Sequence, residues 1–122
     1  MSTQRQRTIV RHGSPRYQFQ LAAIAAAGNY TFAPDIQWPA SKKYSPLDVI
    51  EISNLDPTCD LNIILNGTSP YIVPSSTTRI ITDQALRQIR IENRHAVTAT
   101  TINLVIISCE RAPMTADMAA RV

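Results

Sequence analysis

The sequence predicts an all-β protein, an antiparallel β-sandwich or jelly roll of about 6–8 short strands. The first observation behind this prediction is Asn66–Gly67, which lies between two apolar runs. Both central residues of a type I′ hairpin turn need positive φ angles, which Asn and Gly adopt readily. The second observation is that apolar and polar residues alternate in several segments, as in half-buried strands. The third is that turn residues recur about every ten positions.

The predicted strands follow one another along the chain. Arg16–Leu21 alternates, with Tyr17, Phe19 and Leu21 on one face. Residues 21–27 are Ala-rich and fit either a continued strand or a short helical turn. The remaining predicted strands are Tyr30–Phe32, Leu47–Asn54, Leu61–Leu65, Tyr71–Val73, Thr77–Thr82, Gln88–Glu92 and Thr101–Cys109.

The apolar residues of two predicted strands indicate different degrees of burial. In Gln88–Glu92, two isoleucines alternate with Arg90 and Glu92, so one face of this strand points to the core and the other to solvent. Thr101–Cys109 becomes apolar on both faces. That composition is typical of a central strand, or of a strand whose outer face is covered by another subunit.

The chain fits one domain with two terminal extensions. Its 122 residues suffice to bury a core without disulfides or metals, and the sequence shows no internal repeat. We expect a flexible basic arm at 1–15, a single β-sandwich domain at 16–112 and a short tail at 113–122. Met114–Val122 has weak helical potential, and Pro34–Pro46 is expected to be a long surface connection.

The positive charge of the chain belongs to the arm. The net charge is +3, yet residues 1–16 hold four arginines and no acid, whereas the other residues hold eight basic and nine acidic side chains. The arm is either a frayed, solvated terminus or a segment that orders against a neighbouring subunit or an acidic surface. It lacks interleaved aromatic residues for base stacking, so nucleic acid is not the expected partner.

A second candidate contact region is the surface connection. Trp38 either caps the core, which is the favoured interpretation, or is an exposed anchor at an interface, where Trp is enriched. Lys42, Lys43 and Tyr44 follow within six residues. Together with the arm, this region supplies the predicted partner-binding residues, which are Arg5, Arg7, Arg11, Trp38, Lys42, Lys43 and Tyr44.

The sequence lacks the groupings that catalysis and metal binding need. His12 and His95 are far apart and have no metal-ligand spacing. There is neither a glycine-rich phosphate loop nor a G-x-S-x-G turn. Asp56, Cys59 and Asp60 lack the spacing of a calcium loop, and turn chemistry accounts for Asp56 before a proline. We therefore expect no enzyme activity, no cofactor and no metal site.

Cysteine use and hydropathy indicate the compartment. Cys59 and Cys109 are too few for a disulfide scaffold and are expected to be unpaired thiols in a reducing compartment. No apolar run approaches the roughly 18–20 residues that cross a bilayer, so no membrane is expected. No targeting segment is recognised, which predicts synthesis in the cytoplasm.

Several strand patterns of the body occur together in one known class of protein. A strand ends in Asn at Ile50–Asn54, a hairpin carries Asn66–Gly67, a corner follows at Val73–Pro74, and an I-x-I-x-N strand lies at Ile89–Asn93. This pattern, over about half of the chain, resembles the small jelly-roll or sandwich cement (decoration) and minor capsid proteins of tailed bacteriophages. No single functional residue of that class is implied.

The resemblance implies a structural role on a virion. Such a protein binds the outside of a shell of major capsid protein, often as a dimer or trimer, and bridges neighbouring capsomers to stabilise the head. It is made in the host cytoplasm and resides on the capsid surface. The alternatives are a head-completion or tail protein of the same virus class, a nucleic-acid-binding module that uses the arm, and a carbohydrate-binding sandwich that uses Trp38 and Tyr44.

Overall fold

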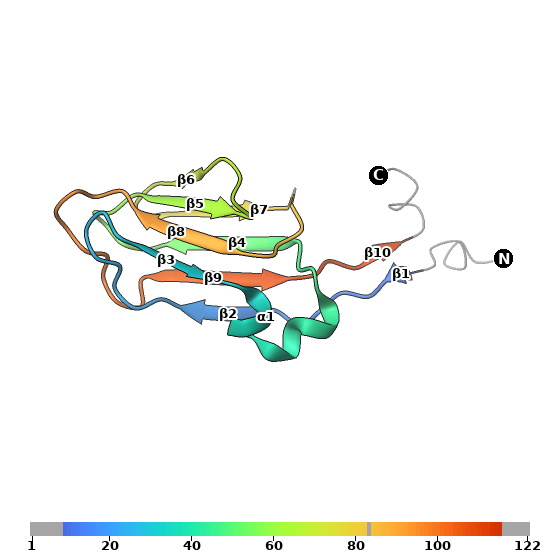
Figure 1. The fold of residues 1–122 in the computed structure, drawn as a ribbon. Coiled ribbons are helices and arrows are strands. Elements are labelled where there is room, and N and C mark those ends of the chain that lie inside the picture. The colour runs from blue at the N-terminus through green and yellow to red at the C-terminus, as the bar shows by residue number, and fades with distance from the viewer. Residues whose placement is uncertain (1–8, 83, 116–122) are drawn as a thin grey trace.

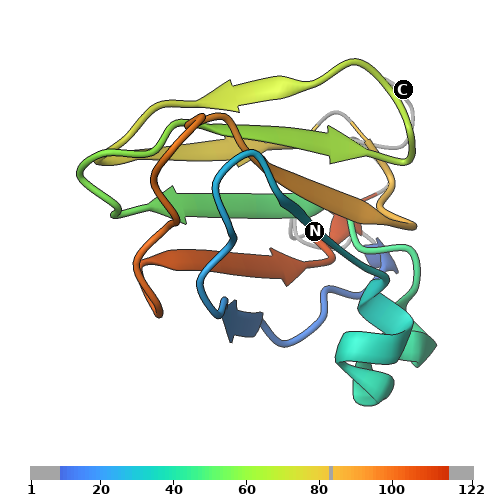
Figure 2. The same ribbon diagram turned by 60° about the vertical axis from the view of Figure 1, so that its left-hand side comes forward.

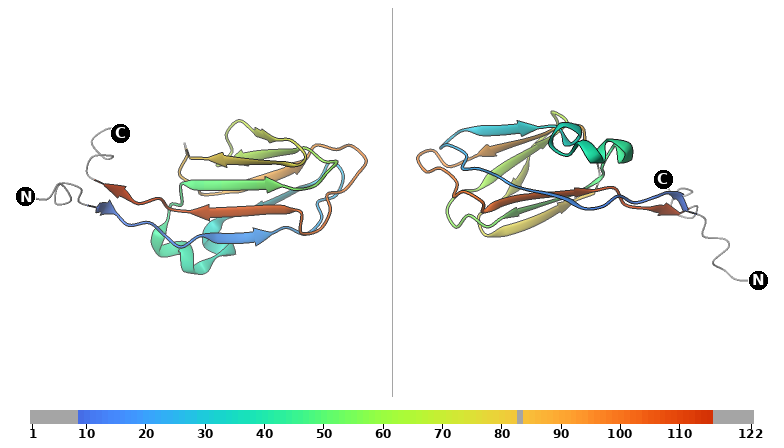
Figure 3. Two further views of the ribbon diagram at one scale, coloured as in Figure 1. Left: turned by 180° about the vertical axis from the view of Figure 1, so that it is seen from behind. Right: turned by 90° about the horizontal axis from the view of Figure 1, so that it is seen from below.

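The computed structural model describes residues 9–82 and 84–115, and in them the chain forms a two-layered antiparallel β-sandwich (Figures 1 and 3). This confirms the predicted fold class. The strands of the first sheet, in spatial order, are β2 (Tyr17–Gln20), β9 (Val105–Glu110), β4 (Val49–Asn54) and β7 (Thr77–Ile81). Those of the second sheet are β3 (Asn29–Phe32), β8 (Ile89–Asn93), β5 (Leu61–Leu65) and β6 (Tyr71–Val73).

The strand pairs are nested within one another, which makes this sandwich a jelly roll. β5 pairs with β6, β4 with β7, β3 with β8 and β2 with β9, and successive pairs alternate between the two sheets. Eight strands folded in this way form the two Greek keys of a jelly roll. A fifth pair, β1 (Ile9–Arg11) with β10 (Met114–Thr115), continues the series outside the sandwich.

The hairpin of β5 and β6 has the predicted turn, but its strands pair one residue out of the register that this turn alone would give. Asn66 and Gly67 have φ angles of 55° and 75°, and the amide of Thr68 donates to the carbonyl of Leu65 at 3.0 Å, which confirms the type I′ turn. Beyond the turn, Ile63 pairs with Tyr71, one residue later than this turn alone would give. The proline that precedes Tyr71 has no N–H to donate, so the ladder omits it.

The inward-facing side chains of both sheets form one core. β4 and β5 alternate between buried and half-buried residues, and β8 has the predicted pattern, with Ile89 and Ile91 buried and Arg90 exposed. The fully buried large side chains are Leu21, Leu47, Ile50, Ile52, Leu61, Ile63, Leu65, Ile89, Ile91, Ile107, Val73 and Val105.

The last strand of the sandwich is central, as predicted, but it is shorter. β9 lies between β2 and β4 and begins at Val105 rather than at Thr101. The residues before it turn, because Asn103 has a φ angle of 66° and its amide donates to the carbonyl of Leu21 at 2.9 Å. A regular strand does not pass through a positive φ angle, so this part of the strand prediction was wrong.

The Ala-rich segment forms neither of the two structures that its sequence allowed. The amide of Leu21 donates to the carbonyl of Val105 at 2.9 Å, so pairing continues one residue past β2. The segment then leaves the sheet and ends in a turn, where the amide of Gly28 donates to Ala25 at 2.8 Å and Ala27 has a φ angle of 55°. This turn carries the chain from the first sheet to the second.

The predicted surface connection contains two short helices, α1 (Pro34–Gln37) and η2 (Pro39–Tyr44). Each begins with a proline, whose fixed φ angle suits the first helical position and whose missing N–H is not needed there. Both helices lie at one edge of the sandwich beside β2 (Figures 1 and 2).

Parts of both terminal extensions pair with each other. β1 and β10 form a two-stranded ribbon that extends away from one end of the sandwich (Figure 3). The weak helical potential of the tail is not realised at Met114–Thr115, where pairing with β1 imposes an extended backbone. Residues 1–8 and 116–122 of the predicted arm and tail lie outside the described residues.

Candidate functional site

The β1–β10 ribbon is the part of the fold best suited to meet a partner. Ile9 pairs with Thr115 and Arg11 with Met114, and the sheet to which they belong has two strands. A two-stranded ribbon by itself is marginally stable in water, and its outer edges carry backbone groups that can pair with another strand. The ribbon therefore offers an edge to which a partner strand can add.

The root of the ribbon is held firmly to the sandwich. The amide of Ser14 donates to the carbonyl of Arg111 at 2.9 Å, and the amide of Arg111 donates to Ser14 Oγ at 2.7 Å. Arg111 Nε also donates to the carbonyl of His12 at 2.9 Å. A Cβ atom on Gly13 would lie 3.0 Å from the Arg111 carbonyl oxygen, so a larger residue there would push the two segments apart by a few tenths of an ångström.

The helix η2 brings predicted contact residues to this root. Lys42 and Lys43 are exposed in its last turn, and Tyr44 is half-buried against the core. The Tyr44 ring centroid lies 5.2 Å from Lys43 Nζ and 5.6 Å from Arg111 Cζ, which are cation–π distances. The structure thus places Arg111 beside Tyr44, although the sequence analysis did not single Arg111 out.

Trp38 caps the core, which confirms the favoured interpretation. Its ring lies 5.9 Å from that of Tyr17 and 5.7 Å from that of Phe32, between centroids, and it packs against the buried cluster. Trp38 Nε1 donates to the carbonyl of Gln18 at 3.4 Å. Because these contacts join β2 to β3, Trp38 closes one open side of the sandwich rather than standing out as an interface anchor.

The arm arginines are described only in part. Arg5 and Arg7 lie outside the described residues, and Arg11 is placed by its backbone in β1. Of the predicted contact set, Lys42, Lys43 and Tyr44 therefore lie beside the root from which the arm departs. The ribbon end of the molecule collects basic residues from both termini and from η2.

Two loops that cross between the sheets at the other end of the sandwich are built alike (Figure 1). One leads from β4 to β5 and the other from β8 to β9, and each starts at the Asn of an I-x-I-x-N strand. In the first loop, Asn54 Nδ2 donates to the carbonyls of Cys59 at 2.8 Å and of Val73 at 3.2 Å. Its Oδ1 accepts from the amide of Asp56 at 3.2 Å.

The second loop repeats these contacts. Asn93 Nδ2 donates to the carbonyls of Thr98 at 2.9 Å and of Ile24 at 3.2 Å, and its Oδ1 accepts from the amide of His95 at 2.9 Å. Both asparagines are buried. The same hydrogen-bond arrangement therefore occurs twice, in a local repeat that starts at Ile50 and at Ile89. The repeat became visible through hydrogen bonds to distant segments.

The residue two places after each asparagine differs. Asp56 Oδ1 accepts from the amides of Thr58 and Cys59, both at 2.9 Å, and its Oδ2 accepts from the amide of Thr101 at 2.7 Å. Burial raises the pKa of the Asp56 carboxyl, but these amides outweigh burial and lower it to about 2. The predicted turn chemistry at this residue is confirmed.

His95 takes the corresponding position with a neutral acceptor. Its Nδ1 accepts from the amide of Val97 at 3.2 Å and from that of Thr98 at 3.0 Å, so Nδ1 carries no proton in this arrangement. Asp60, the other acid of this region, accepts from the amide of Ser75 at 2.8 Å through Oδ1. These side chains hold loops in place, and within residues 9–82 and 84–115 no three metal-ligating side chains are grouped.

Three apolar side chains are exposed on the crossing loops. Leu55 is 48% exposed, Val97 82% and Ile102 60%. Sequence reasoning missed them as surface residues, and it placed Ile102 inside a strand. The loops that carry them lie at the end of the sandwich opposite to the ribbon (Figure 1).

Both cysteines are buried and unpaired, as expected. Burial raises the pKa of the Cys109 thiol to about 12 although Arg16 opposes the shift. Burial also raises the pKa of the Cys59 thiol, and the negative charge of Asp56 adds to this effect. Both groups therefore stay protonated at neutral pH and serve as small core side chains.

No helix in the part of the chain that the structure describes is long and apolar enough to cross a membrane. Comparison of the chain with protein-family models, with curated proteins and with solved structures found no match.

Proposed function

We propose that this chain is a viral structural protein, a cement or decoration protein that binds the outside of a major-capsid-protein shell and bridges neighbouring capsomers. The observation that carries the proposal is the β1–β10 ribbon, which projects from a jelly roll and presents open strand edges. A strand edge and a basic arm can each lie along a neighbouring subunit without a deep pocket. Many such weak contacts gain strength when they are repeated over a shell.

The topology supports the proposal at a general level. Jelly rolls occur in viral capsid proteins, and they also occur in lectins and cupins. A fold alone does not select among these functions. The argument therefore depends on the ribbon and on the basic residues around its root, which include Lys43 and Arg111.

In this proposal the chain has two kinds of partner. One is the major capsid protein, and the other is a second copy of the chain in a dimer or trimer. The protein is made in the host cytoplasm and resides on the capsid surface. Its work is mechanical, so it needs neither catalysis nor a cofactor.

The carbohydrate-binding alternative loses support from the aromatic contacts. Trp38 packs on two neighbouring rings, and the Tyr44 ring has Lys43 Nζ at 5.2 Å and Arg111 Cζ at 5.6 Å from its centroid. Neither ring stands free as a platform on which a sugar could stack. The four arginines of residues 1–16 keep nucleic acid as the rival partner for the arm.

The test is sedimentation of a native lysate from the source, with this protein followed by antibody through the gradient. The proposal expects it to migrate with megadalton particles and a far more abundant shell protein. A chain that lacks residues 1–11, and so lacks β1, should stay at the top of the gradient. If the full chain also stays at the top, the proposal is wrong. Nucleic-acid binding that falls steeply with salt would then favour the rival partner.

A further inference from the structure

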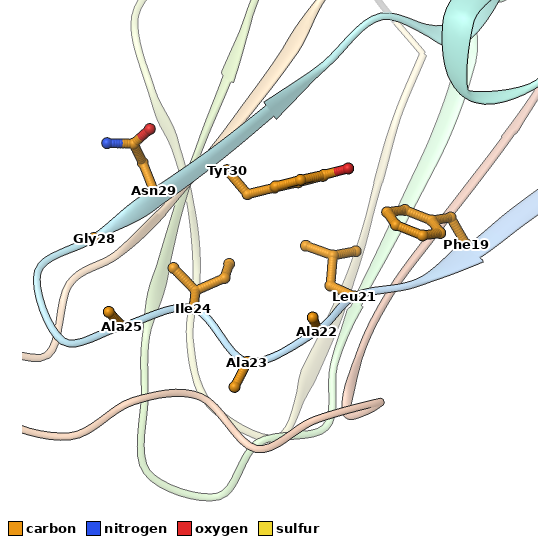
Figure 4. A pocket seen from close by; sticks show the side chains of 9 residues that line it. All are labelled: Phe19, Leu21, Ala22, Ala23, Ile24, Ala25, Gly28, Asn29 and Tyr30. Atoms are coloured by element: carbon orange, nitrogen blue, oxygen red, sulfur yellow. The ribbon is translucent and has the colours of Figure 1, made fainter.

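An apolar hollow lies beside the start of the Ala-rich segment (Figure 4). Its volume is about 240 Å³, and its lining residues are Phe19, Leu21, Ala22, Ala23, Ile24, Ala25, Gly28, Asn29 and Tyr30. An apolar cavity of roughly 150 Å³ is large enough for a benzene ring. The hollow therefore has room for one large apolar side chain.

The edge of β2 is covered by Trp38 at Gln18 and is open at Gln20, next to the hollow. β2 is an outer strand of its sheet. The outward-facing carbonyl of Gln18 already accepts a hydrogen bond from Trp38 Nε1. Successive residues of a strand point their backbone groups to opposite sides, so those of Gln20, the last residue of β2, also face outward. Ala22 and Ala23 make no backbone hydrogen bond to any described residue. A partner strand can pair here and place a side chain in the hollow.

The chain itself carries a segment with the matching pattern. From Met114 to Val122 every even-numbered residue is apolar, namely Met114, Ala116, Met118, Ala120 and Val122, and the odd-numbered ones are polar except Ala119. Strict alternation is typical of a strand with one buried face. β10 is the extended beginning of this segment. Met118 is its largest side chain beyond β10, and the flexible thioether of Met fills irregular apolar spaces well.

The tail cannot reach the hollow of its own molecule. The hollow lies beside Val105, whose carbonyl accepts from Leu21. From there the chain runs through β9 to Thr115 in one direction (Figures 1 and 3). These ten residues take the chain about 33 Å from Val105 when extended, whereas Met118, only three residues beyond Thr115, can return at most about 11 Å. The tail that fills a hollow must therefore come from another molecule.

We infer that residues 116–122 of one copy add to the edge of β2 in a second copy and place Met118 in its apolar hollow. The inference rests on the proposed function, because it specifies the self-association proposed there. The contact is head to tail, since the ribbon end of one copy meets the crossing-loop end of the next. A head-to-tail contact generates a ring when its rotation closes, which accommodates a trimer.

The test is sedimentation equilibrium of the purified full chain over a range of concentrations. We expect Met118→Asp to weaken association at least about tenfold, because it would bury a charge in the hollow. The matched control is Ala119→Asp, whose side chain faces the opposite way in an extended tail and should leave association unchanged. Likewise Ala22→Phe should fill the hollow and weaken association, whereas Ile80→Phe, at an exposed position of β7 on the opposite edge of the sheet, should not. Thermal unfolding checks that the variants fold.

A second measurement identifies the two surfaces directly. Molecules with Ala22→Cys are mixed with molecules with Met118→Cys and oxidised, and a disulfide-linked pair is expected, since both native thiols are buried. The inference is overturned if the full chain is a monomer at all concentrations, if the two tail variants behave alike, or if no linked pair forms. Shell binding in the lysate gradient is a separate readout, so a failed tail contact is distinguishable from a failed capsid role.

Discussion

The two crossing loops begin with the same asparagine contacts but differ two residues later, where one has Asp56 and the other His95. Asn54 and Asn93 each end an inner strand and donate to one carbonyl in the loop that follows and to one in a distant segment. Two residues later, Asp56 accepts three amides, one of them from Thr101 in the other loop. His95 accepts two amides, both from its own loop. A carboxylate with two oxygens can thus connect two loops, whereas one imidazole nitrogen organises a single loop.

The similarity extends to the segments that the loops contact. The amide of Ser76 donates to the carbonyl of Asp56 at 3.1 Å, and the amide of Ala27 donates to that of His95 at 2.9 Å. Ser76 and Ala27 both have a φ angle of 55°. The jelly roll therefore has a local two-fold character at this end. In both loops a buried asparagine holds the same backbone arrangement. The acceptor two residues later differs, being Asp56 in one loop and His95 in the other.

Loss of either asparagine should have the largest effect. We expect Asn54→Ala and Asn93→Ala each to lower the free energy of unfolding by about 3 kcal/mol, because several buried carbonyls lose their donor. Urea unfolding measures the loss. Asn62→Ala, at a half-buried position of β5, is the control and should cost less than about 1 kcal/mol. Clearly unequal losses at the two asparagines would break the proposed equivalence of the loops.

The second effect concerns Asp56 and acid. Its pKa is lowered from 3.8 to about 2 in the folded chain. At pH values above the pKa of the unfolded chain, the ionised carboxylate therefore stabilises the folded state by about 2 kcal/mol. This stability should be lost as the pH falls from about 4 to about 2, because the unfolded chain takes up the proton first. Urea unfolding at a series of pH values measures the slope. Asp56→Asn should unfold more readily at neutral pH and lack this part of the slope; an unchanged slope would contradict the assignment.

A smaller effect is expected at His95. His95→Ala should cost about 1 kcal/mol, since two amides at the surface lose an acceptor but gain access to water. His95→Asp should recover most of that stability, because a carboxylate at the equivalent position of the other loop accepts the same pair of amides. Thermal unfolding compares the three chains. A loss at His95→Ala as large as that at Asp56→Asn would show that His95 also connects the loops.

The smallest effect tests the paired turn residues. Ala27→Gly and Ser76→Gly should each raise the free energy of unfolding by about 0.5–1 kcal/mol, because glycine adopts a positive φ angle without the Cβ clash. Ala33 is the control, since its φ angle is −108° and glycine there should lower stability by increasing the freedom of the unfolded chain. Chemical denaturation of the purified variants measures the changes. A gain at only one of the two turns would limit the two-fold character to the asparagine loops.

Local patterns predicted local structure well in this chain. The alternation around Ile89 and Ile91 predicted which face of β8 is buried, and Asn66–Gly67 predicted a type I′ turn. The register of β5 with β6 was not predictable from the turn, because it depends on where a proline is left out of the ladder. The candidate contact set was recovered in part, with Lys43 and Tyr44 at the root of the ribbon and Trp38 in a capping position.

By itself, the sequence determined the fold class, the positions of most strands, the inward faces of those strands and the turn of the central hairpin. These features depend on the two-residue period of a strand and on the φ preferences of single residues, which neighbours in sequence reveal. Tertiary structure alone decided the nesting of the strand pairs, the joining of Arg111 to Tyr44, and the contacts that Asn54 and Asn93 make. Those contacts link segments up to 69 residues apart, and their partners are backbone carbonyls, which every residue carries and no sequence pattern marks.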